Sequence, residues 1–118
     1  MPILLIYGIP EKVSQASLVT ISKDLIEVIT SFKELNLKEE DIKVFFPADK
    51  MKRARGEKIV IFVRGLFKKP ERTQIVKEKL ALSLVGKMAT KSLAEFSASI
   101  KAECFIEPFD PEKGFANI

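Results

Sequence analysis

Apolar runs and a helical repeat divide the first part of the chain into three elements. Ile3–Tyr7 is a continuous apolar run behind Pro2, and Ile42–Phe46 is a second, largely apolar run. Both predict strands, and proline is tolerated at the head of a strand because that residue need not donate to the ladder. Between the runs the spacing of apolar residues alternates between three and four. This pattern predicts one face of a helix capped by Ser14 or Ser17; the residues are Leu18, Ile21, Leu25, Val28, Phe32 and Leu35.

The second part of the chain repeats this order. Ile59–Val63 predicts a third strand, Arg64–Phe67 a turn, and Pro70 the first turn of a second helix, where proline is favoured. Ile100–Ile106 predicts the fourth strand. The apolar face of the second helix is formed by Ile75, Val76, Leu80, Leu84 and Met88. A strand, a crossover helix and a strand make a parallel unit of right-handed sense, so the chain is expected to contain two such units.

The two units end alike, which indicates a duplication within one domain. The second strand closes with Phe45–Asp49 and the fourth with Ile106–Asp110, and each ending contains a proline. We predict a single α+β domain over residues 1–118, with halves at about 1–49 and 57–110 and a tail at 111–118. Its fold would be two-layered, with a four-stranded mixed sheet that carries both helices on one face.

The first strand of each unit also predicts an assembly. Neither Ile3–Tyr7 nor Ile59–Val63 alternates apolar with polar residues, so both faces of these strands are expected to be covered. Two helices can cover only one face of the sheet. Another subunit is therefore expected to cover the other.

Composition narrows the chemistry and the partners. The chain has no histidine and one cysteine, Cys104, which excludes an internal disulfide framework and disfavours zinc sites and Ser-His or Cys-His nucleophiles. We expect no metal and no cofactor. No apolar run approaches the roughly 20 residues of a membrane span, and no signal-peptide pattern opens the chain, so a cytoplasmic protein is expected. The net charge of +4 suits a small anionic substrate, and we expect neither nucleic acid nor a membrane as a partner.

With this pattern the chain resembles the tautomerase superfamily, the group of 4-oxalocrotonate tautomerase, carboxymethyl-hydroxymuconate isomerase and macrophage migration inhibitory factor. The resemblance covers the whole length as the duplicated strand-helix-strand order. Pro2 opens the chain as the catalytic proline of that family does, and Lys12 and Lys43 fall where family members carry substrate-binding arginines. Residues 109–117 are similar to the ends of the longer members.

The resemblance implies a homotrimer with active sites at the subunit boundaries and no cofactor. Pro2 would be the general base once Met1 is removed, and the substrate would be a small enolisable keto acid. Its carboxylate would contact Lys12 and Lys43, from a neighbouring subunit. Both positions depart from the family pattern, because lysine cannot grip a carboxylate in a bidentate fork as arginine does.

Three other features leave alternatives open. Arg64, at the end of the third strand, could bind a substrate anion or could equally pair with a carboxylate such as Glu71. The basic run Lys50–Arg55 could contact phosphates, although such runs are usually solvated loops. Gly114–Ile118 is expected to add to the sheet edge of a neighbouring subunit, with Phe115 buried.

The chain need not be an enzyme. A trimeric scaffold or ligand-binding protein with the tautomerase fold is the first alternative. A ferredoxin-like binding module is the second, and in that fold another strand would separate Ile3–Tyr7 from Ile42–Phe46. The RNA-binding version requires exposed aromatic residues and a glycine in the third strand, and Ile59–Val63 lacks that pattern.

Overall fold

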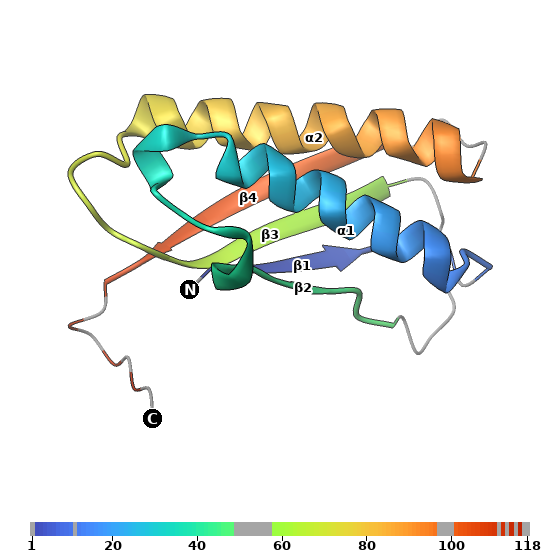
Figure 1. The fold of residues 1–118 in the computed structure, drawn as a ribbon, viewed down its shortest axis with the longest axis horizontal. Helices are drawn as coiled ribbons and strands as arrows, with labels where there is room; N and C mark the ends of the chain where they lie inside the picture. The colour runs from blue at the N-terminus through green and yellow to red at the C-terminus, as the bar shows by residue number, and fades with distance from the viewer. Residues whose placement is uncertain are drawn as a thin grey trace.

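The computed structural model describes residues 2–10, 12–48, 58–96, 101–110, 112, 114 and 116, apart from the side chain of Phe96. Two α-helices, two short 3-10 helices and four strands follow one another along the chain (Figure 1). In order, they are β1 (Ile3–Tyr7), α1 (Gln15–Thr30), η1 (Lys33–Leu35), η2 (Glu39–Asp41), β2 (Lys43–Phe45), β3 (Lys58–Phe67), α2 (Gln74–Phe96) and β4 (Lys101–Phe109).

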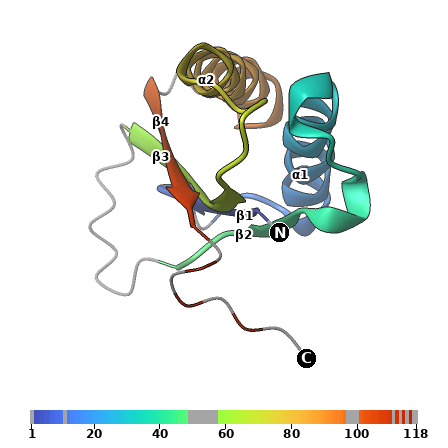
Figure 2. The ribbon, with the colours of Figure 1, turned by 90° about the vertical axis from the view of Figure 1, so that its left-hand side faces the viewer.

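The strands form one mixed sheet in the order β2-β1-β3-β4. β1 pairs with β2 in parallel and β3 pairs with β4 in parallel, while β1 and β3 are antiparallel neighbours. Both helices lie on the same side of this sheet (Figure 2). The predicted fold of two strand-helix-strand units is therefore confirmed. The ferredoxin-like alternative is wrong, because no strand separates β1 from β2.

The helix α1 begins as the sequence predicts and ends earlier. The Oγ of Ser14 accepts a hydrogen bond from the Ser17 N–H at 3.1 Å, which caps the first turn. The buried residues of α1 are Ile21, Leu25 and Ile29, and the helix ends at Thr30. The predicted apolar stripe continues beyond that point only because the chain turns into η1, where Leu35 is fully buried.

The helix α2 begins at Gln74, four residues later than the position of Pro70 suggests. Pro70 lies instead in the turn before the helix. Four of the five predicted core residues of α2 are buried: Val76, Leu80, Leu84 and Met88. The fifth assignment is wrong, because Ile75 is 64% exposed. It lies one residue before Val76 and so points about 100° away from it around the helix.

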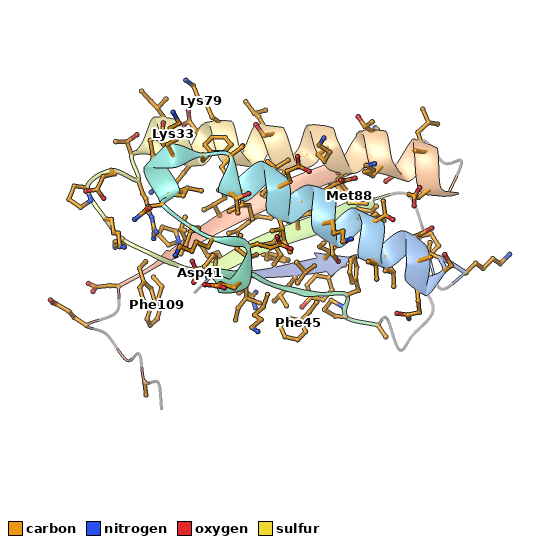
Figure 3. All side chains as sticks on the ribbon, viewed as in Figure 1. Lys33, Asp41, Phe45, Lys79, Met88 and Phe109 are labelled. Carbon is orange, nitrogen blue, oxygen red and sulfur yellow. The ribbon has the colours of Figure 1, made fainter. Side chains whose placement is uncertain are left out.

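The two helices cover only one face of the sheet. Alternate residues of β1 and β3 are buried under the helices: Leu4, Ile6, Ile59, Ile61 and Val63. The intervening residues point away from the helices and form what we call the open sheet face. It includes Ile3, Tyr7, Phe45, Phe62 and Phe105, and Figure 3 shows Phe45 projecting away from both helices. The continuous apolar runs therefore reflect two apolar faces, and the described residues of the single chain cover only one of them.

Both long strands run further than predicted, because a bulge replaces the expected turn. The pairing of β3 with β4 shifts register between Arg64 and Leu66, and Gly65 between them has a φ of 73°, which favours glycine. The extra residue brings Leu66 into the core, where it is 1% exposed. Since β4 is the edge strand, it also tolerates Pro108 within its span.

The turn after β1 requires glycine, which gives a first prediction. Gly8 has a φ of 90°, and a Cβ at this position would lie 2.4 Å from the carbonyl oxygen of Lys58. We expect Gly8→Ala to lower the free energy of unfolding by about 1–3 kcal/mol, because the side chain strains the backbone and collides with a neighbouring strand. Urea denaturation of the variant and the unaltered chain would measure the difference, and an unchanged midpoint would show that the turn can relax.

Candidate functional site

Pro2 is buried beside the start of β1, where it lines an open pocket of about 200 Å³. Its carbonyl oxygen accepts a hydrogen bond from the Lys43 N–H at 3.2 Å, which fixes the chain between β1 and β2. The other lining residues come from the segment before β2, from the end of β3 and from the loop after it: Asn36, Leu37, Asp41, Gly65, Phe67, Lys69 and Arg72. The pocket thus collects residues from both halves of the chain.

The bulge in β3 and the antiparallel pairing of β1 with β3 build one wall of this pocket. Ile3 pairs with Arg64, so the residues that follow Arg64 lie beside Pro2. The left-handed Gly65 re-aims the last residues of the strand. On the opposite wall, Asp41 ends η2, and its Oδ2 accepts a hydrogen bond from the Lys38 N–H at 2.9 Å.

Arg72 is the most unusual group in the pocket, because it is a buried cation held by neutral partners. The residue is 8% exposed. Its Nη1 donates to the carbonyl oxygen of Phe67 at 2.7 Å, and its Nη2 donates to that of Leu35 at 2.8 Å. Its Nε is buried and has no hydrogen-bond partner in the part of the chain that the structure describes. Burial lowers the pKa of the guanidinium, and the nearby carboxylate of Glu71 partly opposes that shift.

A second basic hollow adjoins the first on another side of Arg72. It has a volume of about 230 Å³ and shares Phe67, Lys69 and Arg72 with the Pro2 pocket. Lys68 and Lys77 also line it, and its lining among the described residues includes no acidic side chain. The segment from the end of β3 to the first turn of α2 is therefore strongly cationic. Among the described residues, Glu71 is the carboxylate whose charge acts on Arg72.

The cations selected from sequence lie elsewhere. Lys12 is exposed in the turn before α1, beyond the far end of β1 from Pro2. Lys43 is exposed at the start of β2, and Arg64 is exposed on β3; in register they flank Ile3 on its two sides. None of the three lines the Pro2 pocket. Lys12 can approach a Pro2 pocket only in another copy of the chain, since β1 alone is about 17 Å long.

Arg64 pairs with a carboxylate at the surface, as one of the two alternatives expected, but the partner is Glu107 on the neighbouring strand and not Glu71. Its Nε lies 2.8 Å from Oε2 of Glu107 on β4, and its guanidinium carbon lies 5.0 Å from the centre of the Phe62 ring. A second pair joins Lys58 to Glu103 at 3.0 Å. Both pairs are exposed on the open sheet face. The acidic residues Glu103 and Glu107 of β4 are therefore ion-pair partners for basic residues of β3.

The sequence contained a signal for Lys69 and Arg72 that depends on the topology. Arg64, Lys68, Lys69 and Arg72 follow one another closely after the third strand. Only the antiparallel pairing of β1 with β3 brings this segment to Pro2. Local pattern does not reveal which strands are neighbours, so the cluster was overlooked.

Several candidates remain outside the described residues or carry no reactive group. The basic run Lys50–Arg55, Met1 and Phe115 all lie outside them, as does most of Gly114–Ile118. Cys104 packs against the core, and burial raises the pKa of its thiol to about 12, so its thiolate is disfavoured. Within the described residues, no three acidic, cysteine or histidine side chains gather as metal ligands, and no helix is both long and apolar enough to cross a membrane.

Comparison with known proteins assigns the fold. By sequence, the chain matches no protein-family model and no curated protein. By structure, it matches a symmetric trimer of fused 4-OT with a TM-score of 0.66 and 13% identity, over 98% of this chain and 92% of that one. It matches N1, a member of the cis-3-chloroacrylic acid dehalogenase family, with a TM-score of 0.68 and 11% identity, over 97% and 79%.

A third match is a 5-carboxymethyl-2-hydroxymuconate isomerase from Deinococcus radiodurans R1, with a TM-score of 0.62 and 12% identity, over 98% of this chain and 88% of that one. The three proteins share the architecture that the sequence pattern indicated. The chain has the fold of the tautomerase superfamily, over nearly its full length.

The contacts of Arg72 generate a prediction about stability. Arg72→Leu leaves the carbonyl groups of Phe67 and Leu35 without their charged donor, and such hydrogen bonds contribute about 1.5–3 kcal/mol each. We expect the free energy of unfolding to fall by about 2–5 kcal/mol in urea denaturation.

Lys69→Met is the matched control, because Lys69 lines the same pocket but is exposed. We expect this control to change the stability by less than about 0.5 kcal/mol. Equal losses in the two variants would show that the Arg72 hydrogen bonds do not anchor η1 and β3.

Proposed function

We propose that the chain is a cofactor-independent tautomerase or isomerase that acts on a small enolisable keto acid, with Pro2 as the general base. One observation carries the proposal: Pro2 shares its pocket with Arg72, a buried cation that has no ion-pair partner within 4.0 Å among the described residues. A buried charge is costly unless it is paired. The carboxylate of a bound substrate would supply the missing anion.

Removal of Met1 would make Pro2 a secondary amine. Two features of the pocket favour the neutral amine, because burial disfavours a charged group and the cations Lys69 and Arg72 repel a protonated one, whereas the carboxylate of Asp41 acts in the opposite direction. Both effects lower the pKa of an ammonium toward the neutral range, where a general base works best. Pro2 could then take the proton from an enol oxygen or an α-carbon and return it to the other position.

Lys69 and Arg72 extend the substrate-binding set beyond Lys12, Lys43 and Arg64. In the proposed site, Arg72 binds the substrate carboxylate and Lys69 adds a positive charge at the mouth of the pocket. Lys12 and Lys43 do not line the Pro2 pocket of their own chain and would come from a neighbouring subunit. Such an arrangement holds the carboxylate away from the amine, and the positive charges also stabilise the enolate that forms during the transfer.

We further propose that three copies assemble through the open sheet face. Aromatic rings already pack on that face: Phe62 stacks on Phe105 with ring centres 5.4 Å apart, and it meets Tyr7 edge-on at 5.8 Å. Phe105 and Phe45 are still 48% and 52% exposed. An apolar patch of this kind on a single chain is typical of an interaction surface. The fused 4-OT of the comparison is itself a trimer.

The role of Pro2 can be tested by following the ketonisation of phenylenolpyruvate by absorbance, with untagged protein whose amino terminus is confirmed by intact mass. Pro2→Ala retains a primary amine, so it should slow the reaction without abolishing it. Adding one residue before Pro2 converts the amine to an amide and should remove the contribution of the base, which is about 100- to 10,000-fold.

Pro10→Ala is the control, because Pro10 lies in the loop after β1 and does not line the pocket. It should retain the full rate. If the unaltered chain, Pro2→Ala and the extended chain all react at the rate of buffer, the catalytic proposal is wrong. A trimer without catalytic activity would then be the better description.

The trimer can be tested by placing a charge on the open sheet face. Phe105→Lys puts an ammonium between Glu103 and Glu107, where it finds acidic neighbours in the folded chain but opposes apolar burial between chains. We expect sedimentation equilibrium at micromolar concentration to give a trimer or a multiple of it for the unaltered chain and a smaller species for the variant.

Val19→Lys is the matched control, since Val19 is 54% exposed on α1, in the helical layer. This variant should remain trimeric. A monomer from the unaltered chain, or equal dissociation of both variants, would contradict assembly through the sheet.

A further inference from the structure

The outer side of α2 carries a straight row of exposed residues that the core does not use. We call it the outer stripe; it consists of Ile75, Lys79, Leu82, Gly86, Ala89 and Leu93. Ile75, Leu82 and Leu93 are 64%, 73% and 62% exposed. Alternating steps of four and three keep a row on one side of a helix, and this row lies opposite the buried row. In Figure 3, Lys79 projects away from the sheet, while Met88 lies on the sheet side of α2.

The outer stripe lacks the charges that an exposed helix face normally carries. Charged residues make up 31% of the chain, and the solvent side of a surface helix is usually the most charged part. Beyond Lys79, every exposed residue of α2 up to Ala94 is uncharged: Leu82, Ser83, Gly86, Ala89, Thr90, Leu93 and Ala94. A face with large aliphatic side chains and almost no charge is typical of a surface that another molecule covers.

Gly86 indicates what kind of molecule that is. Glycine in the middle of a helix costs about 0.5–1 kcal/mol relative to alanine. No neighbour among the described residues requires it, because a Cβ at this position would meet none of their atoms within 4 Å. The missing side chain leaves a hollow in the outer stripe, one helical turn from the exposed Leu82. A glycine on an exposed helix face permits close approach of a second helix.

We infer that the outer stripe pairs with the same stripe of a second copy, with the two helices antiparallel about a two-fold axis. The stripe has the same spacing read from either end, as a two-fold contact requires. With the two-fold axis at the level of residue 84 along the helix, the pairing sets Leu82 of each copy into the hollow at Gly86 of the other. It also sets Ile75 against Leu93 and Lys79 against Ala89, so the two Lys79 side chains stay apart and no like charges face each other.

Other arrangements use the stripe less well. A parallel pair would set Leu82 against Leu82 and Gly86 against Gly86, which crowds one layer and leaves a gap in the next. The antiparallel contact is also independent of the proposed trimer, because α2 covers the face of the sheet opposite to the open sheet face (Figure 2). The same chain can therefore take part in both contacts.

Cysteine cross-linking of the full-length chain tests the pairing and its direction. Leu82→Cys and Gly86→Cys are prepared separately, mixed and oxidised, and the linked peptides are identified by mass spectrometry. The mixture should form an 82–86 disulfide at least roughly tenfold faster than either variant alone forms an 82–82 or an 86–86 disulfide. In the antiparallel register, residue 82 of one copy and residue 82 of the other are displaced by four residues along the helix axis, and the same holds for residue 86. Added to the separation of the two helices, this displacement puts their Cα atoms beyond the roughly 7 Å that a disulfide can span. Unaltered protein, with only Cys104, reports the background.

Leu82→Glu and its neighbour Ser83→Glu form a matched pair for a second measurement. Both residues are exposed on α2, and circular dichroism should show both variants folded. In sedimentation velocity, Leu82→Glu should weaken the association between copies by at least about tenfold, while Ser83→Glu should leave it largely unchanged. The proposal is overturned if only 82–82 links form, if no link exceeds background, or if the outer stripe instead binds anionic lipid vesicles in a manner that Leu82→Glu abolishes.

Discussion

The antiparallel pairing of β1 with β3 is the contact on which the rest of the structure depends. In the described sheet it is where the two strand-helix-strand halves meet, from Ile3 opposite Arg64 to Tyr7 opposite Val60. Because the strands run in opposite directions, the end of β3 comes to the start of β1. The loop that carries Lys69 and Arg72 therefore meets Pro2. The pocket is a product of the junction, and neither half contains it alone.

The sequence predicted the elements well because their signals are local. A three-and-four spacing, a capping serine and apolar runs identified both helices and all four strands, and the duplicated order led to the correct fold. Local pattern failed where the outcome depends on a partner strand. Arg64-Gly65 looks like a turn but is a bulge, because β4 continues beside it. Lys69 and Arg72 were missed for the same reason, since their closeness to Pro2 follows from strand pairing rather than from spacing.

Charge is arranged differently on the sheet and in the loop before α2. On the sheet, cations face acidic partners across strands, as in Arg64 with Glu107 and Lys58 with Glu103. Such exposed pairs contribute at most about 1 kcal/mol each to stability. Arg72, in the loop before α2, instead has no carboxylate within 4.0 Å among the described residues. Two carbonyl groups hold it in place. The first arrangement is balanced by carboxylates, whereas the second holds its positive charge with neutral groups.

The burial of Cys104 has a consequence for how this protein responds to acidity. Histidine, the side chain that ordinarily titrates between about pH 5 and 8, is absent from the chain. Burial moves the pKa of the Cys104 thiol to about 12, so the folded state keeps this thiol protonated across the physiological range. Neither of the usual neutral-range titrating side chains therefore contributes there. An amino-terminal amine, with an ordinary pKa of about 8, would titrate against an almost constant background of charge.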